Sequence, residues 1–264
     1  MASLAPVGVG DHVCWAVPAK ADFQRAALAY LTDGTRLGDK IMVVGSPSRS
    51  WRLDLRGPQG VLVDPSACDV DWDANALVSL LRQEAEEAGR QGFRALRVLA
   101  HMDHFWPAGL TPRQVADHEL RLDAVIGASA AMVVCAYAGS GFLPDVLGQA
   151  ATVHPHFAGD RDAAPSFQVF SAGEDCWNVS GVVDADGAPA FHTAVTELLR
   201  TTDTLRLRCQ GLELMDAAGM QALVEASGAH PGRTIMVEDA NPLVRKCWEL
   251  LGYDSPAVPV ELVP

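Results

Sequence analysis

Two histidines stand where a ligand site could form. His101 and His104 lie three residues apart and follow "LRVLA", an apolar run typical of a buried strand. In a sheet of parallel strands, ligands bind beyond the carboxyl ends of the strands, so these imidazoles would face the ligand crevice. Imidazole and thiolate groups are common ligands of transition metals and of haem iron. The donors that could join the two histidines in such a site are His12, Cys14 and Cys135.

An ordinary structural role is the alternative, because histidines at strand ends are more often hydrogen-bonded polar groups than ligands. The sequence contains no GxSxG or HExxH motif and no nucleophile–base grouping in a supporting context. The stretch "GTRLGDK", residues 34–40, follows a predicted helix and has isoleucine where a phosphate-binding loop needs serine or threonine. It therefore predicts a helix end and a turn. We expect no enzymatic activity.

Composition restricts the partners and the cellular location. The chain of 264 residues has a formal net charge of −13, which opposes binding to nucleic acid and to anionic membranes. No apolar stretch reaches the roughly 18 residues that a membrane-spanning helix needs. The six cysteines are scattered without a CxxC pair, and the first residues lack a secretory signal pattern. We expect a cytoplasmic protein whose partners are small molecules and other proteins.

Hydrophobic patterns predict an α/β protein that begins with a mainly parallel sheet and flanking helices. The residues up to "GDHVC" are interpreted as a flexible start. The strands that we predict in this half span residues 41–44, 61–63, 95–100 and 131–136. The helices that we predict span residues 20–37, 73–91, 114–126 and 143–153.

A break in this rhythm predicts two domains. The stretch "FAGDRDAAPS", residues 157–166, has no apolar periodicity and is rich in linker residues. We place the first domain at residues 1–158, the linker at 159–166 and a smaller α/β domain at 167–264. The elements predicted in the smaller domain are strands 166–171, 176–182, 204–209 and 234–238 and helices 185–200, 217–227 and 241–251.

The stretch "LMDAAGM" in the smaller domain joins a predicted strand to a predicted helix. Asp216 is placed to cap that helix, where unpaired N–H groups and the helix dipole would also stabilise a phosphate. Ala217, the next residue, has no hydroxyl that could accept one. Two explanations remain open for "DAAG": a plain cap followed by small residues that allow close packing, or a loop that binds a partner.

At these residues the domain resembles the STAS domains of anti-sigma-factor antagonists. The resemblance includes "SGVVDADGAPAF", with Gly181 and Asp184, then "LELMDAAGMQALVEA" and "NPLVRKCWELLGY". It implies that a kinase target serine would occupy position 217, so this domain cannot be switched there. The partner implied is an anti-sigma factor or a histidine-kinase-type switch protein. The partner-binding residues implied are Asp184, Asp216, Ala217, Ala218 and Gly219.

The first domain resembles the MEDS sensory domain, which is related to the RecA-like α/β fold. Its motifs are matched by "GDHVCWAV", "HMDHFW", "HELRLDAV", "VVCAY" and the "HP" at His154. The resemblance implies recognition of a small-molecule signal. The residues implied as the ligand pocket are His12, Cys14, His101, His104, Glu119, Cys135, Tyr137 and His154.

Together these features predict a small-molecule-sensing regulator that signals through a STAS domain which cannot be phosphorylated at position 217. A haem- or metal-binding redox sensor or enzyme that uses the histidines and cysteines of the first domain is the alternative, although no cofactor is assigned. A third interpretation is a scaffold whose first domain binds nothing. The sequence is also compatible with a homodimer.

Overall fold

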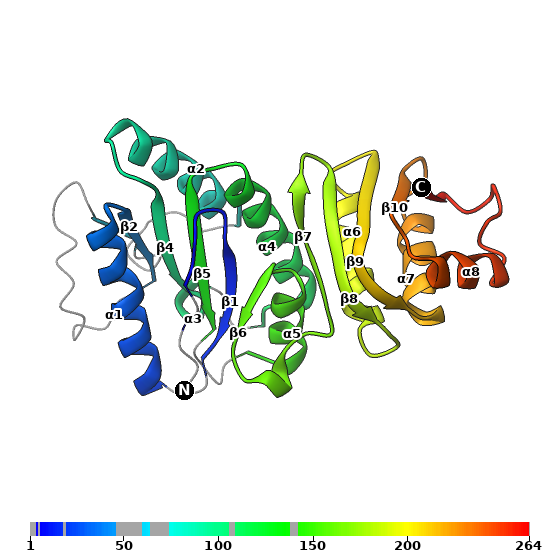
Figure 1. The fold of residues 1–264 in the computed structure, drawn as a ribbon, viewed down its shortest axis with the longest axis horizontal. Coiled ribbons are helices and arrows are strands. Elements are labelled where there is room, and N and C mark those ends of the chain that lie inside the picture. The colour runs from blue at the N-terminus through cyan, green and yellow to red at the C-terminus, as the bar shows by residue number, and fades with distance from the viewer. Residues whose placement is uncertain are drawn as a thin grey trace. The chain divides into compact units, whose positions relative to one another are not determined.

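The computed structural model describes residues 4, 6–17, 20–45, 60–63, 74–105, 109–137 and 142–263, which form two compact units, each with its own sheet (Figure 1). The predicted α/β class is confirmed in both. Within the described ranges, every helix is too short or too polar to cross a membrane.

The first sheet has six strands, all parallel, in the order β3-β2-β4-β5-β1-β6. Parallel strands covered on both faces consist of nearly continuous apolar residues, as "KIMVV" and "AMVVCAY" do. The strands are β1 (His12–Ala16), β2 (Lys40–Val44), β3 (Gly60–Val63), β4 (Leu96–His101), β5 (Ala131–Tyr137) and β6 (His156–Ala158).

Strand β1 corrects the interpretation of the first residues as a flexible start. It lies inside the sheet, between β5 and β6, and its residues His12 to Trp15 are buried (Figure 1). A strand this short, with a histidine and a cysteine inside it, gives almost no local signal. Strand β6 was not predicted for the same reason, since it has only three residues.

Among the described residues, five helices lie between these strands along the chain, and the four that were predicted are confirmed with ends that differ by at most a few residues. The short helix α3 was not predicted. The helices are α1 (Lys20–Leu37), α2 (Ala74–Arg90), α3 (Met102–Phe105), α4 (Pro112–Gly127) and α5 (Pro144–Thr152).

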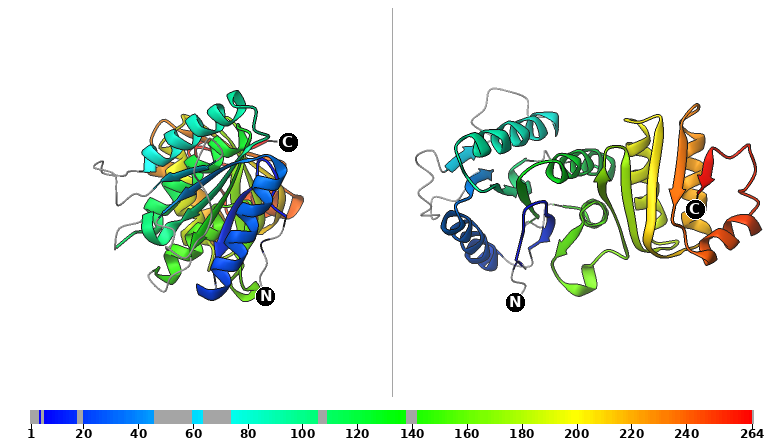
Figure 2. Two further views of the ribbon diagram at one scale, coloured as in Figure 1. Left: turned by 90° about the vertical axis from the view of Figure 1, so that its left-hand side faces the viewer. Right: turned by 45° about the horizontal axis from the view of Figure 1, so that its top comes forward.

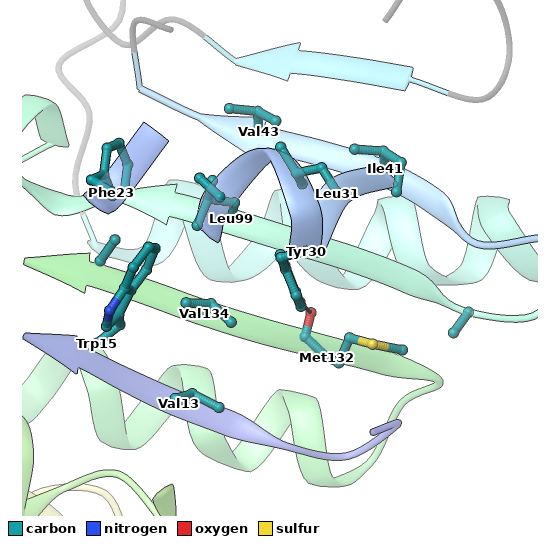
Figure 3. Packing of buried hydrophobic residues seen from close by; sticks show 13 residues of the cluster. Val13, Trp15, Phe23, Tyr30, Leu31, Ile41, Val43, Leu99, Met132 and Val134 are labelled. Atoms are coloured by element: carbon teal, nitrogen blue, oxygen red, sulfur yellow. Dashed lines mark hydrogen bonds between the residues drawn. The ribbon is translucent and has the colours of Figure 1, made fainter. Parts of the chain in front are cut away.

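Helix α1 covers one face of the sheet with a continuous apolar core (Figures 2 and 3). Phe23 and Leu31 of α1 are buried with Trp15 of β1, Leu99 of β4 and Val134 of β5. Neighbouring residues of a strand point to opposite faces. The other residues of β1 and β5, among them the polar ones, therefore point away from α1.

The turn after α1 confirms that "GTRLGDK" is a helix end and not a phosphate-binding loop. Gly38 has φ +81°, a conformation that favours glycine, and the Asp39 amide donates to the Gly34 carbonyl at 2.9 Å. The lysine that follows is buried, and its Nζ lies 2.8 Å from a carboxylate oxygen of Glu84. Lys40 is thus engaged within the fold.

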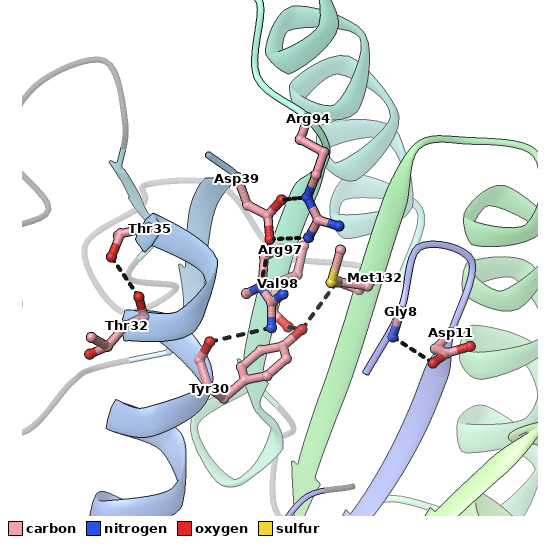
Figure 4. A network of polar contacts seen from close by, with 10 residues as sticks. All are labelled: Gly8, Asp11, Tyr30, Thr32, Thr35, Asp39, Arg94, Arg97, Val98 and Met132. Carbon is pink, nitrogen blue, oxygen red and sulfur yellow. Dashed lines mark hydrogen bonds and ion pairs between the residues drawn. The ribbon is translucent and has the colours of Figure 1, made fainter. Parts of the chain in front are cut away.

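Asp39 in the same turn is the centre of a partly buried charge network (Figure 4). The Asp39 carboxylate accepts hydrogen bonds from Arg94 Nε at 2.7 Å and from Arg97 Nε at 2.8 Å. The Arg97 guanidinium also lies 4.6 Å from the centre of the Tyr30 ring and donates to the Tyr30 carbonyl. Burial raises the pKa of the Tyr30 hydroxyl far above its usual value, and the hydrogen bond to Asp39 raises the pKa of Arg94.

The second sheet has five strands in the order β11-β10-β9-β8-β7, with β7 antiparallel to β8 and the other pairs parallel (Figure 1). Its strands are β7 (Phe167–Gly173), β8 (Cys176–Val183), β9 (Thr204–Met215), β10 (Thr234–Glu238) and β11 (Val260–Leu262). Its helices are α6 (Ala188–Leu199), α7 (Ala217–Gly228) and α8 (Pro242–Leu250), and a 3-10 helix, η2 (Arg161–Ala163), precedes β7.

Strand β9 is longer than predicted and alternates strictly along its first half. Leu205, Leu207 and Cys209 are buried, whereas Arg206 and Arg208 are exposed. Burial raises the pKa of the Cys209 thiol to about 12. The prediction ended at Cys209 because Gln210 and Gly211 interrupt the alternation, where the register to β8 also shifts. Strand β11 was missed because only three residues form it.

Candidate functional site

The first sheet brings a histidine and a cysteine together that are far apart in the sequence. Strands β1 and β5 are parallel neighbours, with His12 in register with Val133, so Cys135 lies two residues further along the same face. His12 Nε2 lies 3.5 Å from Cys135 Sγ. On the other side of the imidazole, Nδ1 lies 3.1 Å from Oδ1 of Asp123 in α4. All three side chains are buried.

Helix α4 adds a second carboxylate to this place. Glu119 precedes Asp123 by four residues, and this spacing puts both on the same face of one continuous helix. Glu119 Oε2 lies 3.5 Å from Nε2 of His154, and neither side chain is exposed to solvent. The other nitrogen of His154, Nδ1, lies 2.7 Å from the Ala150 carbonyl near the end of α5. Since a carbonyl only accepts, Nδ1 carries a proton.

Four buried groups therefore converge. The donor atoms of His12, Glu119, Cys135 and His154 all lie within 4.8 Å of one another. Two imidazole nitrogens, one sulfur and one carboxylate oxygen are groups that bind transition metals. The arrangement could also hold a proton between acid and base groups, because His12 lies between a thiol and a carboxylate. We call these four residues the buried cluster.

Two further predicted residues lie beside the buried cluster. Cys14 is in register with Cys135, and Tyr137 follows Cys135 by two residues on β5. Both therefore emerge on the face of the sheet that carries Cys135, and both are buried. Asp123 was not predicted. The only signal for it was its four-residue distance from Glu119 in "HELRLDAV".

The expected grouping of His101 with His12 or Cys135 needs correction. His101 is in register with Ala136, the neighbour of Cys135, so it points to the opposite face of the sheet. There its ring stacks on Phe23 of α1, with ring centres 4.7 Å apart, and Nε2 lies 3.9 Å from Asp103. His104 belongs to α3, and its side chain lies outside the described residues.

The predicted partner-binding residues lie together at the carboxyl ends of β8 and β9, two inner strands of the second sheet. Asp184 follows β8 and Asp216 follows β9, and these strands are parallel with Val183 in register with Met215. The Asp216 amide donates to the Val183 carbonyl at 3.0 Å, which ties the two strand ends together. Asp184 Oδ1 accepts from the Gly187 amide at 3.0 Å and shapes the turn before α6.

Asp216 caps α7 as predicted. Its Oδ1 accepts from the amides of Ala218 at 2.8 Å and Gly219 at 3.0 Å. A Cβ at Gly219 would lie 2.8 Å from side-chain atoms of both Met215 and Val183, so only glycine fits this close approach of helix and sheet. Ala217 is exposed. The motif "DAAG" therefore has a structural role at its first and last residues and presents its second residue to solvent.

Comparison with known proteins supports both resemblances. A family model described as "MEDS: MEthanogen/methylotroph, DcmR Sensory domain" matches residues 11–155, and one described as "Mlab, STAS domain" matches residues 170–264. A similar solved structure is "Structure of the Anti-Sigma Factor Antagonist SpoIIAA in its Unphosphorylated Form", at 12% identity and a TM-score of 0.29 over 37% of this chain and 87% of that one. No curated protein matches the chain significantly.

Proposed function

The chain belongs to the MEDS family of sensory domains and continues into a STAS domain, and from this we propose that it is a regulator that binds a small ligand and signals to a protein partner. The ligand site is the buried cluster. The docking surface is formed by Asp184 and the residues from Asp216 to Gly219. The partner is an anti-sigma factor or a histidine-kinase-type switch protein.

One observation carries the sensory half of the proposal: the convergence of the buried cluster inside the MEDS match. Burial of an ionisable side chain costs free energy unless another group compensates it. A ligand of complementary charge at the meeting point of the four groups would add to the compensation that their contacts within the fold already provide. Clusters of this kind are found preferentially at functional sites.

The absence of a hydroxyl at position 217 supports a switch driven by ligand. Ala217 is exposed at the first turn of α7, where its side chain offers no acceptor for a phosphoryl group. Control of partner binding at this position must then come from another signal. A ligand can supply it only by binding two states of the protein with different affinity.

Catalysis is not part of the proposal. Cys135, His12 and Asp123 follow one another at 3.5 and 3.1 Å, the order of a nucleophile, a base and the carboxylate that orients the base. The thiol of Cys135, however, is fully buried within β5. A substrate carbonyl would need to reach the sulfur, and no side of the buried thiol faces solvent.

Substitution of Ala217 tests the docking surface. In pull-downs of the full chain with purified switch kinases, Ala217→Asp is expected to weaken binding at least about tenfold, because it adds a charge at the centre of the surface. Ala229→Asp, at the exposed far end of the same helix, is the matched control and should bind normally. Kinase binding that is unchanged by Ala217→Asp would contradict the placement of this surface.

A further inference from the structure

The geometry points to a closed transition-metal site formed by His12, Glu119, Cys135 and His154, and Zn²⁺ is the ion that it fits best. This inference rests on the proposed function and deepens it, because it names the ligand of the sensory domain as a metal ion. The regulator would then change its partner binding according to whether this site holds a metal ion. Three features of the buried cluster carry the inference: spacing, orientation and charge.

The spacing is that of a four-coordinate ion. In tetrahedral zinc sites the bonds of about 2.0–2.3 Å place pairs of ligand atoms roughly 3.3–3.6 Å apart. The separations are 3.5 Å between His12 Nε2 and Cys135 Sγ and 3.5 Å between His154 Nε2 and Glu119 Oε2. No pair of donor atoms in the set is more than 4.8 Å apart. The space between them suits one ion and is far too small for a porphyrin or an organic signal molecule.

Both imidazoles are held in the orientation that metal ligation requires. A histidine that binds a metal usually donates its other N–H to a carboxylate or a backbone carbonyl, which fixes the ring. His12 Nδ1 faces Asp123 at 3.1 Å, and His154 Nδ1 faces the Ala150 carbonyl at 2.7 Å. In each ring the nitrogen that remains, Nε2, is the one that points into the buried cluster.

Charge and donor type select the ion. A thiolate and a carboxylate together neutralise a divalent cation, so the ion and its four ligands would carry no net charge in a place that water does not reach. Mg²⁺ and Ca²⁺ prefer oxygen ligands only, whereas a set of two nitrogens, one sulfur and one oxygen suits Zn²⁺ and its spectroscopic substitute Co²⁺. Four protein ligands leave no open position for water, as in structural and regulatory sites.

The first experiment uses the intact chain without substitutions. After removal of metal by a chelator and addition of Zn²⁺, elemental analysis is expected to find about one zinc per chain. With Co²⁺ the protein should show the intense visible bands of a tetrahedral ion and a sulfur-to-cobalt charge-transfer band. Folded protein that retains neither metal after gel filtration would overturn the metal site.

Substitutions then identify the ligands. Cys135→Ala is expected to abolish the charge-transfer band, whereas Cys209→Ala, at a cysteine buried in the second unit, should leave it intact. Asp123→Asn keeps all four ligands and should weaken Zn²⁺ binding about 10- to 100-fold, as loss of an orienting partner does. A charge-transfer band that survives in Cys135→Ala would overturn the assignment.

The metal site and the proposed function can fail separately. A metal-free, folded chain whose kinase binding still depends on Ala217 would overturn the metal site and leave the regulator. If the chain binds Zn²⁺ as described, but its kinase affinity changes neither with Zn²⁺ nor with substitution of Ala217, the proposed regulatory function would be overturned and the metal site would remain. If both hold, Zn²⁺ should change kinase affinity in the wild type and not in Cys135→Ala.

Discussion

Individual side chains of the first unit show how polar groups are accommodated inside it. His12 and Asp39 are both fully buried, and each contacts an oppositely charged or polar group at hydrogen-bond distance. They differ in the groups that their polar atoms face. Asp39 is bound by two guanidinium groups that complete its hydrogen bonding, whereas His12 turns its second nitrogen toward three other donor groups. The first is a structural pair, and the second is part of a candidate ligand site.

The structural pair gives a prediction at this scale. Asp39→Asn removes the charge that compensates Arg97, which is 4% exposed, and should lower the free energy of unfolding by about 3–5 kcal/mol. Asp33→Asn is the control, because Asp33 pairs at 3.5 Å with an exposed arginine, Arg36, and should change stability by less than about 1 kcal/mol. Urea denaturation measures both. An effect of Asp39→Asn that is as small as the expected effect of Asp33→Asn would show that the Asp39 network adds no stability.

At the scale of elements, two glycines of the second unit contribute to stability in opposite ways. Gly181 in β8 has φ +86°, and a Cβ there would lie 2.3 Å from the Ser166 carbonyl oxygen. Gly228 ends α7 with no atom near its missing side chain and with an ordinary φ. The first glycine is required where β7 begins beside β8. The second only adds conformational freedom to the unfolded chain.

This contrast predicts changes of opposite sign. Gly181→Ala should destabilise the protein by at least about 2 kcal/mol, from the left-handed backbone and the close contact together. Gly228→Ala should be neutral or stabilise by up to about 1 kcal/mol, because alanine loses less entropy than glycine in a helix. Both are measured as shifts of the urea midpoint. A stable Gly181→Ala variant would mean that the start of β7 can move away from β8.

At the scale of the whole molecule, net charge influences solubility. A formal charge of −13 adds electrostatic repulsion between copies of the chain at neutral pH. The sequence pI is about 4.9, so this repulsion vanishes in mildly acidic solution. Solubility therefore depends on pH even where the fold does not change.

Titration of solubility tests this statement. The amount of protein in solution should pass through a minimum near pH 4.9 and recover on either side, as measured by absorbance after centrifugation. Replacing the exposed Glu86 and Glu225 by lysine should move the minimum to higher pH. A minimum that stays in place would show that unfolding, and not net charge, causes the precipitation.

The sequence by itself determined most of the elements and most of their limits, but not the short strands β1, β6 and β11 or the short helix α3. Helix α1 and strand β10 begin and end where the sequence predicted, and Asp216 caps α7 as its place before an apolar-periodic run indicated. Apolar periodicity, caps and turns depend on residues within a few positions of one another, so they can be recognised in one dimension. The MEDS and STAS resemblances rest on such local motifs and are confirmed.

Only the tertiary structure decided which polar residues meet. His12 contacts Cys135 because β1 inserts beside β5, and His101 does not because its place on β4 points to the other face. Strand order and register are set by contacts between distant parts of the chain, and a shift of one residue turns every side chain of a strand over. The sequence could therefore supply the donors of the buried cluster, whereas their convergence on one point is a property of the packed sheet.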